Sequence, residues 1–229
     1  LLLHYPYFDL YRKQVIKQAD LVLAMHLRGD AFTSEQKARN MAYYEPRTVR
    51  DSSLSACTQS VLAAEVGALE LAYDYFAETA FTDLHDLHDN VRNGVHIAAM
   101  AGAWLDVVAG FGGMRDHGGN VTFAPRLPEP LSRYTFRMCV GSSLLCVEVT
   151  PHEATYRLLS GAPLDTAHHG KQITVEPEQP LTLSIPSAPQ PPKLRQPHGH
   201  EPVHRDKSMI ARQGENPIVG RGRLADQLD

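Results

Sequence analysis

The sequence has little of what marks several large classes of protein. Its 229 residues carry 22 Lys and Arg against 26 Asp and Glu, which gives a net charge of -4. Proteins that bind nucleic acid or an anionic membrane surface usually have a basic surplus, so neither kind of partner is expected. No apolar run reaches the roughly 18 residues that a membrane-spanning helix needs. We therefore expect no nucleic-acid partner and no membrane partner.

Cysteine is scarce, and the start of the chain lacks the marks of a leader. The three cysteines form neither a zinc-ligand pattern nor a dense disulfide framework. The opening residues, LLLHYPYFDLYRKQ, have no basic region ahead of a long apolar core, so they do not predict a signal peptide. These absences favour a reducing, cytoplasmic location. The chain also has no initiator Met, and we expect an N-terminal part to be missing.

The first half of the chain predicts helices of two alternating kinds. Three segments are small or apolar on nearly every side, as in buried helices: residues 15–28, 52–66 and 95–110. Two segments between them carry a polar face: residues 34–44 and 69–80, the latter with Glu70, Asp74 and Glu78. This alternation predicts a double layer, with inner helices wrapped by outer ones. Five helices do not close such a ring.

The period of the pattern changes to two after Gly112. Alternating segments such as RYTFRMCV and LLCVEVT, separated by Gly and Pro, predict a small antiparallel sheet. The last stretch is rich in Pro and polar residues without periodicity, which predicts disorder. The predicted organisation is a helical part at 1–112, a sheet domain at 113–186 and a disordered tail at 187–229. The predicted fold class is mainly α with a β appendage.

One hairpin register is predicted from cross-strand pairs. A turn at Ser142-Ser143 would place Arg137 opposite Glu148, a favourable pair, and Cys139 opposite Cys146. The two cysteines are then neighbours, either as packed thiols or as a disulfide. A reducing compartment favours thiols.

Polar residues stand at the start of each helix predicted to be buried. Lys17 and Gln18 precede an apolar run, where a charge is costly unless it meets a partner or a ligand. Ser52 and Ser53 open the second such helix, and helix starts offer N–H groups that bind phosphate. Taken alone, each set has an ordinary explanation, such as an ion pair with Asp20 or a helix cap.

The third helix begins with Gly94 and His96. Gly permits close approach of the backbone to a ligand, and His96 can donate to an anion, although a lone His more often serves packing. In an inner ring of parallel helices, all three starts gather at one mouth of the barrel. We therefore predict a site there for a sugar and an anion.

The segment DLHDLHDN, residues 83–90, contains His85 and His88 among aspartates. Its spacing matches no specific zinc signature, so we expect a solvated loop and no metal site.

Four ordered motifs resemble the C-terminal part of glycoside hydrolase family 65: VIKQADLVLAMHLRGDAF, YYEPRTVRDSSLSA, NGVHIAAMAGAW and GFGGMR followed by FAPRLP. The family contains trehalose, maltose and kojibiose phosphorylases and some hydrolases, including acid trehalases. The resemblance extends to about residue 185. It implies a partial (α/α)6 barrel followed by a small antiparallel β-sheet domain, and a homodimer for full-length members.

The resemblance also implies roles for the polar residues. Lys17 and Gln18 would bind glucose, whereas Ser52, Ser53, Gly94 and His96 would hold phosphate. Inorganic phosphate would be a co-substrate with the disaccharide, and no cofactor is implied. Phosphate would attack the anomeric carbon with inversion while a glutamic acid protonates the glycosidic oxygen.

This sequence departs from the family in ways that affect activity. The general acid is expected upstream of residue 1, and Val91 and Asn93 stand where Thr and Asp are expected. The chain alone is therefore expected to be inactive, with apolar helix faces uncovered. A hydrolase of the same family and a non-catalytic binding module are the alternatives. Glu45, a potential base for water attack, is interpreted as a structural turn residue.

Overall fold

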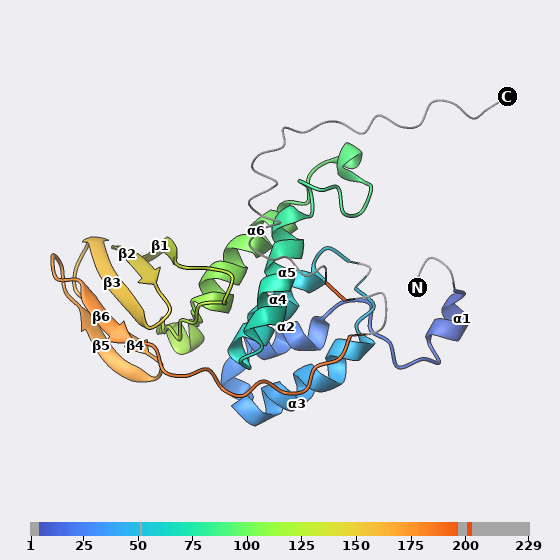
Figure 1. Ribbon diagram of the computed structural model, residues 1–229, viewed down its shortest axis with the longest axis horizontal. Coiled ribbons are helices and arrows are strands. Elements are labelled where there is room, and N and C mark those ends of the chain that lie inside the picture. Colours follow the sequence, from blue (N-terminus) through green and yellow to red (C-terminus); the bar gives the residue numbers. More distant parts are fainter. Residues whose placement is uncertain (1–4, 51, 197–200, 203–229) are drawn as a thin grey trace.

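The computed structural model describes residues 5–50, 52–196 and 201–202. It contains a helical part followed by a small antiparallel sheet (Figure 1). The predicted fold class, mainly α with a β appendage, is therefore confirmed. Within the described residues, no helix is long and apolar enough to cross a membrane.

Among the described residues, the helical part has six α-helices: α1 (Tyr7–Leu10), α2 (Asp20–Leu27), α3 (Ser34–Tyr44), α4 (Ser55–Glu65), α5 (Leu69–Phe81) and α6 (Ile97–Leu105). Helix α6 continues into a π-helix, η4 (Asp106–Phe111). Short 3-10 helices occupy the connections: η1 (Gly29–Ala31), η2 (Glu45–Arg47), η3 (Val91–Asn93) and η5 (His117–Gly119).

Local signals set two of these helix ends. Thr33 caps α3: its hydroxyl accepts the Gln36 N–H, and the Gln36 side chain accepts the Thr33 N–H. Gly67 follows α4 with φ +89°, a left-handed conformation that glycine adopts at little cost. The turn at Gly67 leads directly from α4 into α5, which packs against it.

Helix α4 lies at the centre of the helical part. Eight of its 11 residues are buried, and it packs against α2, α5 and α6. Its small side chains allow close approach, because a Cβ at Gly102 of α6 would lie 2.9 Å from the Cys57 Cβ. The predicted alternation of inner and outer helices holds only in part: α4 is buried, but α5 buries six residues whereas α2 and α6 bury two each.

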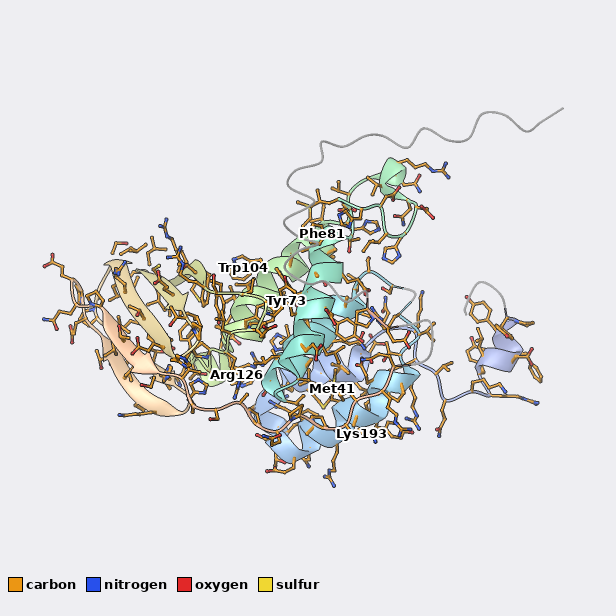
Figure 2. The ribbon with its side chains drawn as sticks, in the orientation of Figure 1. Met41, Tyr73, Phe81, Trp104, Arg126 and Lys193 are labelled. Carbon is orange, nitrogen blue, oxygen red and sulfur yellow. The ribbon has the colours of Figure 1, made fainter. Side chains whose placement is uncertain are left out.

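The prediction that α2 and α6 are buried on every side is wrong. Leu21 and Leu27 of α2 are 47% and 61% exposed. On α6, Ile97, Met100 and Trp104 are 73%, 61% and 48% exposed. Trp104 is labelled in Figure 2. These apolar side chains face solvent because no described segment covers these faces of α2 and α6.

The polar face predicted for α5 is also only partly solvated. Glu70 is exposed, whereas Asp74 is 7% exposed and therefore buried. Glu78 forms an ion pair with Arg50. Acidic residues spaced by four share a face of the helix, but the segments packed against that face decide their exposure.

The sheet has two parts. A four-stranded antiparallel sheet has the order β1 (Tyr134–Val140), β2 (Ser143–Val149), β3 (Glu153–Ser160) and β6 (Leu181–Ser184). A separate hairpin pairs β4 (Leu164–His168) with β5 (Lys171–Val175).

The predicted hairpin register is wrong by two residues. Arg137 faces Cys146 in the structure, and Val140 faces Ser143, so the turn lies at Gly141-Ser142. Gly141 has φ +58°, the left-handed conformation that two-residue hairpin turns favour. Because the shift is two residues, the buried face keeps the predicted apolar side chains.

The cysteines follow from this register. Cys139 faces Leu144 rather than Cys146, so the two thiols occupy diagonal positions on one face. Cys57, Cys139 and Cys146 are all free. The thiols favoured from the sequence are present, but only Cys146 is buried, whereas Cys139 is exposed.

One hydrophobic core runs from the helices into the sheet. Phe111 of η4 contacts Phe76 of α5 and Tyr134 of β1, with ring centroids 5.4 and 6.2 Å apart. Glu65 of α4 accepts hydrogen bonds from Lys37 Nζ at 2.6 Å and Arg115 Nη2 at 2.7 Å. Burial alone would raise the pKa of Glu65, but these two cations outweigh it and hold the pKa below its ordinary value.

The predicted disorder from residue 187 needs correction over its first part. Residues 187–196 run as an extended segment back across the helices (Figure 1), and Leu194 packs against the core. A Pro-rich composition favours extended backbone, and contacts with the helices hold this segment in place. Apart from 201–202, the rest of the predicted tail lies outside the described residues.

Asp106 brings a carboxyl group into the middle of the helical core. It is fully buried, and neither carboxyl oxygen has a hydrogen-bond partner of ordinary geometry. The neighbouring polar side chains donate to backbone carbonyls: Cys57 to Gly102, Ser60 to Ala72 and Thr79 to Tyr75. Burial raises the pKa of Asp106 well above its ordinary value, although contacts with Cys57, Thr79 and Ser60 lower it in part, so folding favours the neutral carboxyl.

Replacing Asp106 with Asn tests this neutral state. Above about pH 4 the unfolded chain ionises the group, so the folded state holds one extra proton. The wild-type free energy of unfolding then falls as pH rises, by at most about 1.4 kcal/mol per unit from this group. Asp106→Asn removes that loss. Urea unfolding should show the variant gaining stability relative to wild type between about pH 5 and pH 8; a pH-independent difference contradicts a neutral carboxyl.

Candidate functional site

The segment that carries Lys17 and Gln18 precedes its helix. We predicted both residues in the first turn, but α2 begins at Asp20. Instead, the Ile16 N–H donates to the Arg47 carbonyl at 2.9 Å, and the Ile16 carbonyl accepts from Val49 N at 2.8 Å. This short parallel bridge lays the segment beside the one leading to Ser52. Lys17 is exposed.

Ser52 contacts the predicted glucose-binding segment. Gln18 Nε2 donates to Ser52 Oγ at 3.0 Å, although the two residues are 34 positions apart. The Leu54 N–H also donates to Ser52 Oγ at 3.3 Å, a local turn contact ahead of α4, which begins at Ser55 without a side-chain cap. A serine oxygen has two acceptor positions and one O–H. Both acceptor positions are used here, which leaves the O–H to donate to a ligand.

The loop before Ser52 is held by residues that the sequence did not single out. Arg50 has φ +61° and pairs with Glu78 of α5; its side chain is only 7% exposed. Its guanidinium also stacks over the Tyr75 ring, 4.6 Å from the centroid. Its neighbours in the sequence are polar and looked like a helix cap, so only the fold reveals this role.

His96 is fixed by a second residue missed as a site component. Asp83 Oδ1 lies 2.6 Å from His96 Nδ1, and Oδ2 accepts the His96 N–H at 2.8 Å. The hydrogen bond from His96 lowers the pKa of Asp83, so its carboxylate is ionised and receives the Nδ1 hydrogen. Nε2 then remains for a ligand. Asp83 belongs to the segment tested above for metal spacing.

Gly94 provides an open backbone beside His96. It has φ +118°, a conformation that residues with a side chain rarely adopt. A Cβ at this position would meet nothing within 4 Å. Approach of a ligand to this backbone is therefore unobstructed.

The three predicted sets lie at one end of the helical part. Helix α5 is antiparallel to its neighbours α4 and α6, so the starts of α4 and α6 lie together, away from the sheet (Figure 1). Gln18 and Ser52 are in direct contact. Among the described residues, no hydrogen bond joins His96 to Gln18, Ser52 or Ser53. No cluster of three or more metal-ligating side chains occurs in the part of the chain that the structure describes.

Glu45 is unavailable as a base for water. It is 1% exposed and accepts hydrogen bonds from Gln59 Nε2 and Gln196 Nε2, both at 2.8 Å, and from the Tyr75 hydroxyl. Burial and then the Glu45 charge raise the pKa of Tyr75 well above its ordinary value, so the phenol stays a donor. These contacts agree with a structural role.

Two stretches of the chain match models of known protein families. Residues 1–105 match the glycosyl hydrolase family 65 central catalytic domain, and residues 114–175 match the C-terminal domain of that family. The chain belongs to glycosyl hydrolase family 65. The resemblance inferred from the four motifs is confirmed, and the two matches meet where the helices give way to the sheet.

Relatives in family 65 include proteins of several descriptions. An uncharacterised glycosyl hydrolase of Mycobacterium tuberculosis is 51% identical over 211 residues, covering 90% of this chain and 26% of that protein. An α,α-trehalose phosphorylase of Thermoanaerobacter brockii is 42% identical over 77% of this chain and 23% of that protein. The chain thus spans about a quarter of the length of the curated relatives that it matches.

A solved family 65 structure supports the fold assignment. A candidate kojibiose phosphorylase from the human microbiome superimposes with a TM-score of 0.74 at 29% identity, covering 79% of this chain and 26% of that one. The helical layers are a partial (α/α)6 barrel, followed by the small sheet.

Arg50→Ala tests the anchoring of the segment that carries Arg50, Ser52 and Ser53, here called the serine loop. The substitution leaves Glu78 without its cation and uncovers Tyr75, so we expect a loss of about 2–4 kcal/mol in the free energy of unfolding. Arg47→Ala is a matched control, because Arg47 stacks on Tyr43, a ring that is 44% exposed. It should cost less than about 1 kcal/mol. Equal losses in urea unfolding would contradict the anchoring role.

Proposed function

We propose that this chain supplies the glucose- and phosphate-binding part of an inverting phosphorylase that acts on an α-linked glucose disaccharide. The observation that carries the proposal is the hydrogen bond from Gln18 to Ser52, which joins a predicted glucose ligand to a predicted phosphate ligand. A nucleophile and the sugar that it attacks must lie side by side. The phosphorylases of trehalose, maltose and kojibiose among its relatives support this reading.

The proposed reaction transfers one glucosyl group. A phosphate oxygen forms a bond to the anomeric carbon, while the glycosidic carbon–oxygen bond breaks on the opposite face. A general acid outside this chain gives its proton to the departing sugar oxygen. Ser52, Ser53, the Gly94 backbone and His96 orient the phosphate, and Lys17 and Gln18 hold the glucose. The products are β-glucose 1-phosphate and glucose, and no cofactor takes part.

A hydrolase of the same family is the second candidate. Water attack would need a carboxylate base facing the sugar. Glu45 does not fill that role, because Tyr75, Gln59 and Gln196 occupy its oxygens. The O–H of Ser52, whose oxygen already accepts two hydrogen bonds, can donate to a phosphate oxygen.

A non-catalytic binding module is the third candidate. The exposed apolar faces of α2 and α6 favour an interaction with another polypeptide. We propose that further barrel helices cover these faces in the active enzyme. Association of the chain with itself in solution would instead support the binding module.

Phosphate binding by the 229-residue chain tests the proposed anion site. Calorimetric titration with inorganic phosphate should show saturable binding. Ser52→Ala and Ser53→Ala each remove a charge-assisted hydrogen bond and should weaken binding by roughly tenfold. Ser132→Ala, at an exposed loop position, is the matched control and should bind like wild type. If all three variants bound phosphate as tightly as wild type, Ser52 and Ser53 would not be phosphate ligands.

Turnover tests the reaction itself. The chain alone should release no glucose 1-phosphate from trehalose, maltose or kojibiose, because it lacks the general acid. Joined to the preceding segment of the Thermoanaerobacter brockii trehalose phosphorylase, it should cleave trehalose only when phosphate is present. Cleavage at the same rate without phosphate would establish a hydrolase.

A further inference from the structure

Residues 187–196, here called the C-terminal strap, connect the sheet back to the helical part. Figure 1 shows this segment leaving β6 and passing along α3. Its fit is close, because a Cβ on Gly67, at the α4–α5 turn, would collide with the Pro189 carbonyl. Leu194 packs against the core. Any continuous stretch that covers 90% of this chain includes the strap, so it lies within the similarity to the mycobacterial relative.

The end of the strap reaches a buried charge. Gln196 Nε2 donates to Glu45 Oε1 at 2.8 Å, across 151 positions of sequence. The other donors to this carboxylate, Gln59 of α4 and Tyr75 of α5, come from helices. A buried carboxylate needs its donors, and loss of one leaves an acceptor unsatisfied. The strap therefore completes the environment of Glu45.

Glu45 in turn belongs to the support of the serine loop. The Tyr75 hydroxyl donates to Glu45, and the face of the same ring carries the Arg50 guanidinium. Arg50 lies two positions before Ser52. A single aromatic side chain thus couples the carboxylate reached by Gln196 to the loop that presents the serine hydroxyls.

We propose that Gln196 is a positioning residue for the anion site. By holding Glu45, the strap keeps Tyr75 and Arg50 in place and so fixes Ser52 and Ser53. The proposal rests on the proposed function only in taking phosphate as the ligand. Gln196 does not touch that ligand, because its amide is committed to a buried carboxylate.

Gln196→Ala in the 229-residue chain tests the proposal, with Lys193→Ala as control. Lys193 lies on the same strap beside α3 (Figure 2), and its side chain is exposed. Hydrogen exchange over residues 45–55 should be about fivefold faster in Gln196→Ala and unchanged in Lys193→Ala. The inorganic phosphate Kd should rise by roughly five- to tenfold. Tm should fall as well, because an oxygen of the buried Glu45 carboxylate loses its donor. A merely structural contact would lower Tm and leave the Kd as it was.

A double-mutant cycle that combines Gln196→Ala with Glu45→Ala tests whether Gln196 acts through Glu45. If Gln196 acts through Glu45, adding Gln196→Ala to Glu45→Ala has no further effect on exchange or on phosphate binding. Gln196→Glu serves if Glu45→Ala does not fold. It places a second carboxylate beside Glu45, so it should loosen the loop at least as much as Gln196→Ala.

The outcomes separate this proposal from the proposed function. Faster exchange without any phosphate binding by the wild-type chain supports the positioning role and removes the phosphorylase assignment. Unchanged exchange in Gln196→Ala overturns the positioning role whatever the affinity. Faster exchange with an unchanged Kd in a chain that binds phosphate also overturns it, because the loop would then bind its ligand without the strap. Additive effects in the double-mutant cycle overturn the route through Glu45.

Discussion

The arrangement of the helical part depends on one buried carboxylate. Glu45 loses its hydration on folding, and such a loss is tolerated only when hydrogen-bond donors replace the water. Its donors, Gln59, Tyr75 and Gln196, lie far apart along the chain. Satisfying this charge therefore fixes α3, α4, α5 and the strap relative to one another. The same arrangement positions the serine loop, because the Tyr75 side chain contacts both Glu45 and Arg50.

Much of the fold could be predicted because its signals are local. The bounds of α3, the end of α4 at Gly67 and the alternation of strands after residue 113 follow from caps, glycine conformations and periodicity. The start of α2 could not, because bonds to the Arg47 and Val49 backbone hold the preceding residues outside the helix. The hairpin register failed because charge pairing was weighed above the turn conformation of Gly141.

The candidate site was predicted in part for a similar reason. Residue types at helix starts identified Ser52 and His96, and the topology of antiparallel neighbours brings those starts to one end. Their partners could not be predicted, because Arg50 binds Glu78 and His96 binds Asp83 across loops and helices. The sequence drew attention to Asp83 only because it lies in the His- and Asp-rich segment 83–90, whose spacing was considered for a metal site. Sequence analysis thus proposed the ligand-facing groups, whereas the residues that orient them are visible only in the structure.

The core shared by helices and sheet has a consequence for how such proteins recombine. Phe111 packs against both parts, and Glu65 of α4 binds Arg115, which lies in the connection to the sheet. Exchange of the sheet alone between family members would replace only one of the two partners in each of these contacts and so disrupt them. Crossovers placed before α2 keep every one of them, together with the strap. The unit that can be exchanged intact in this part of the protein is therefore α2 to α6 together with the sheet and the strap.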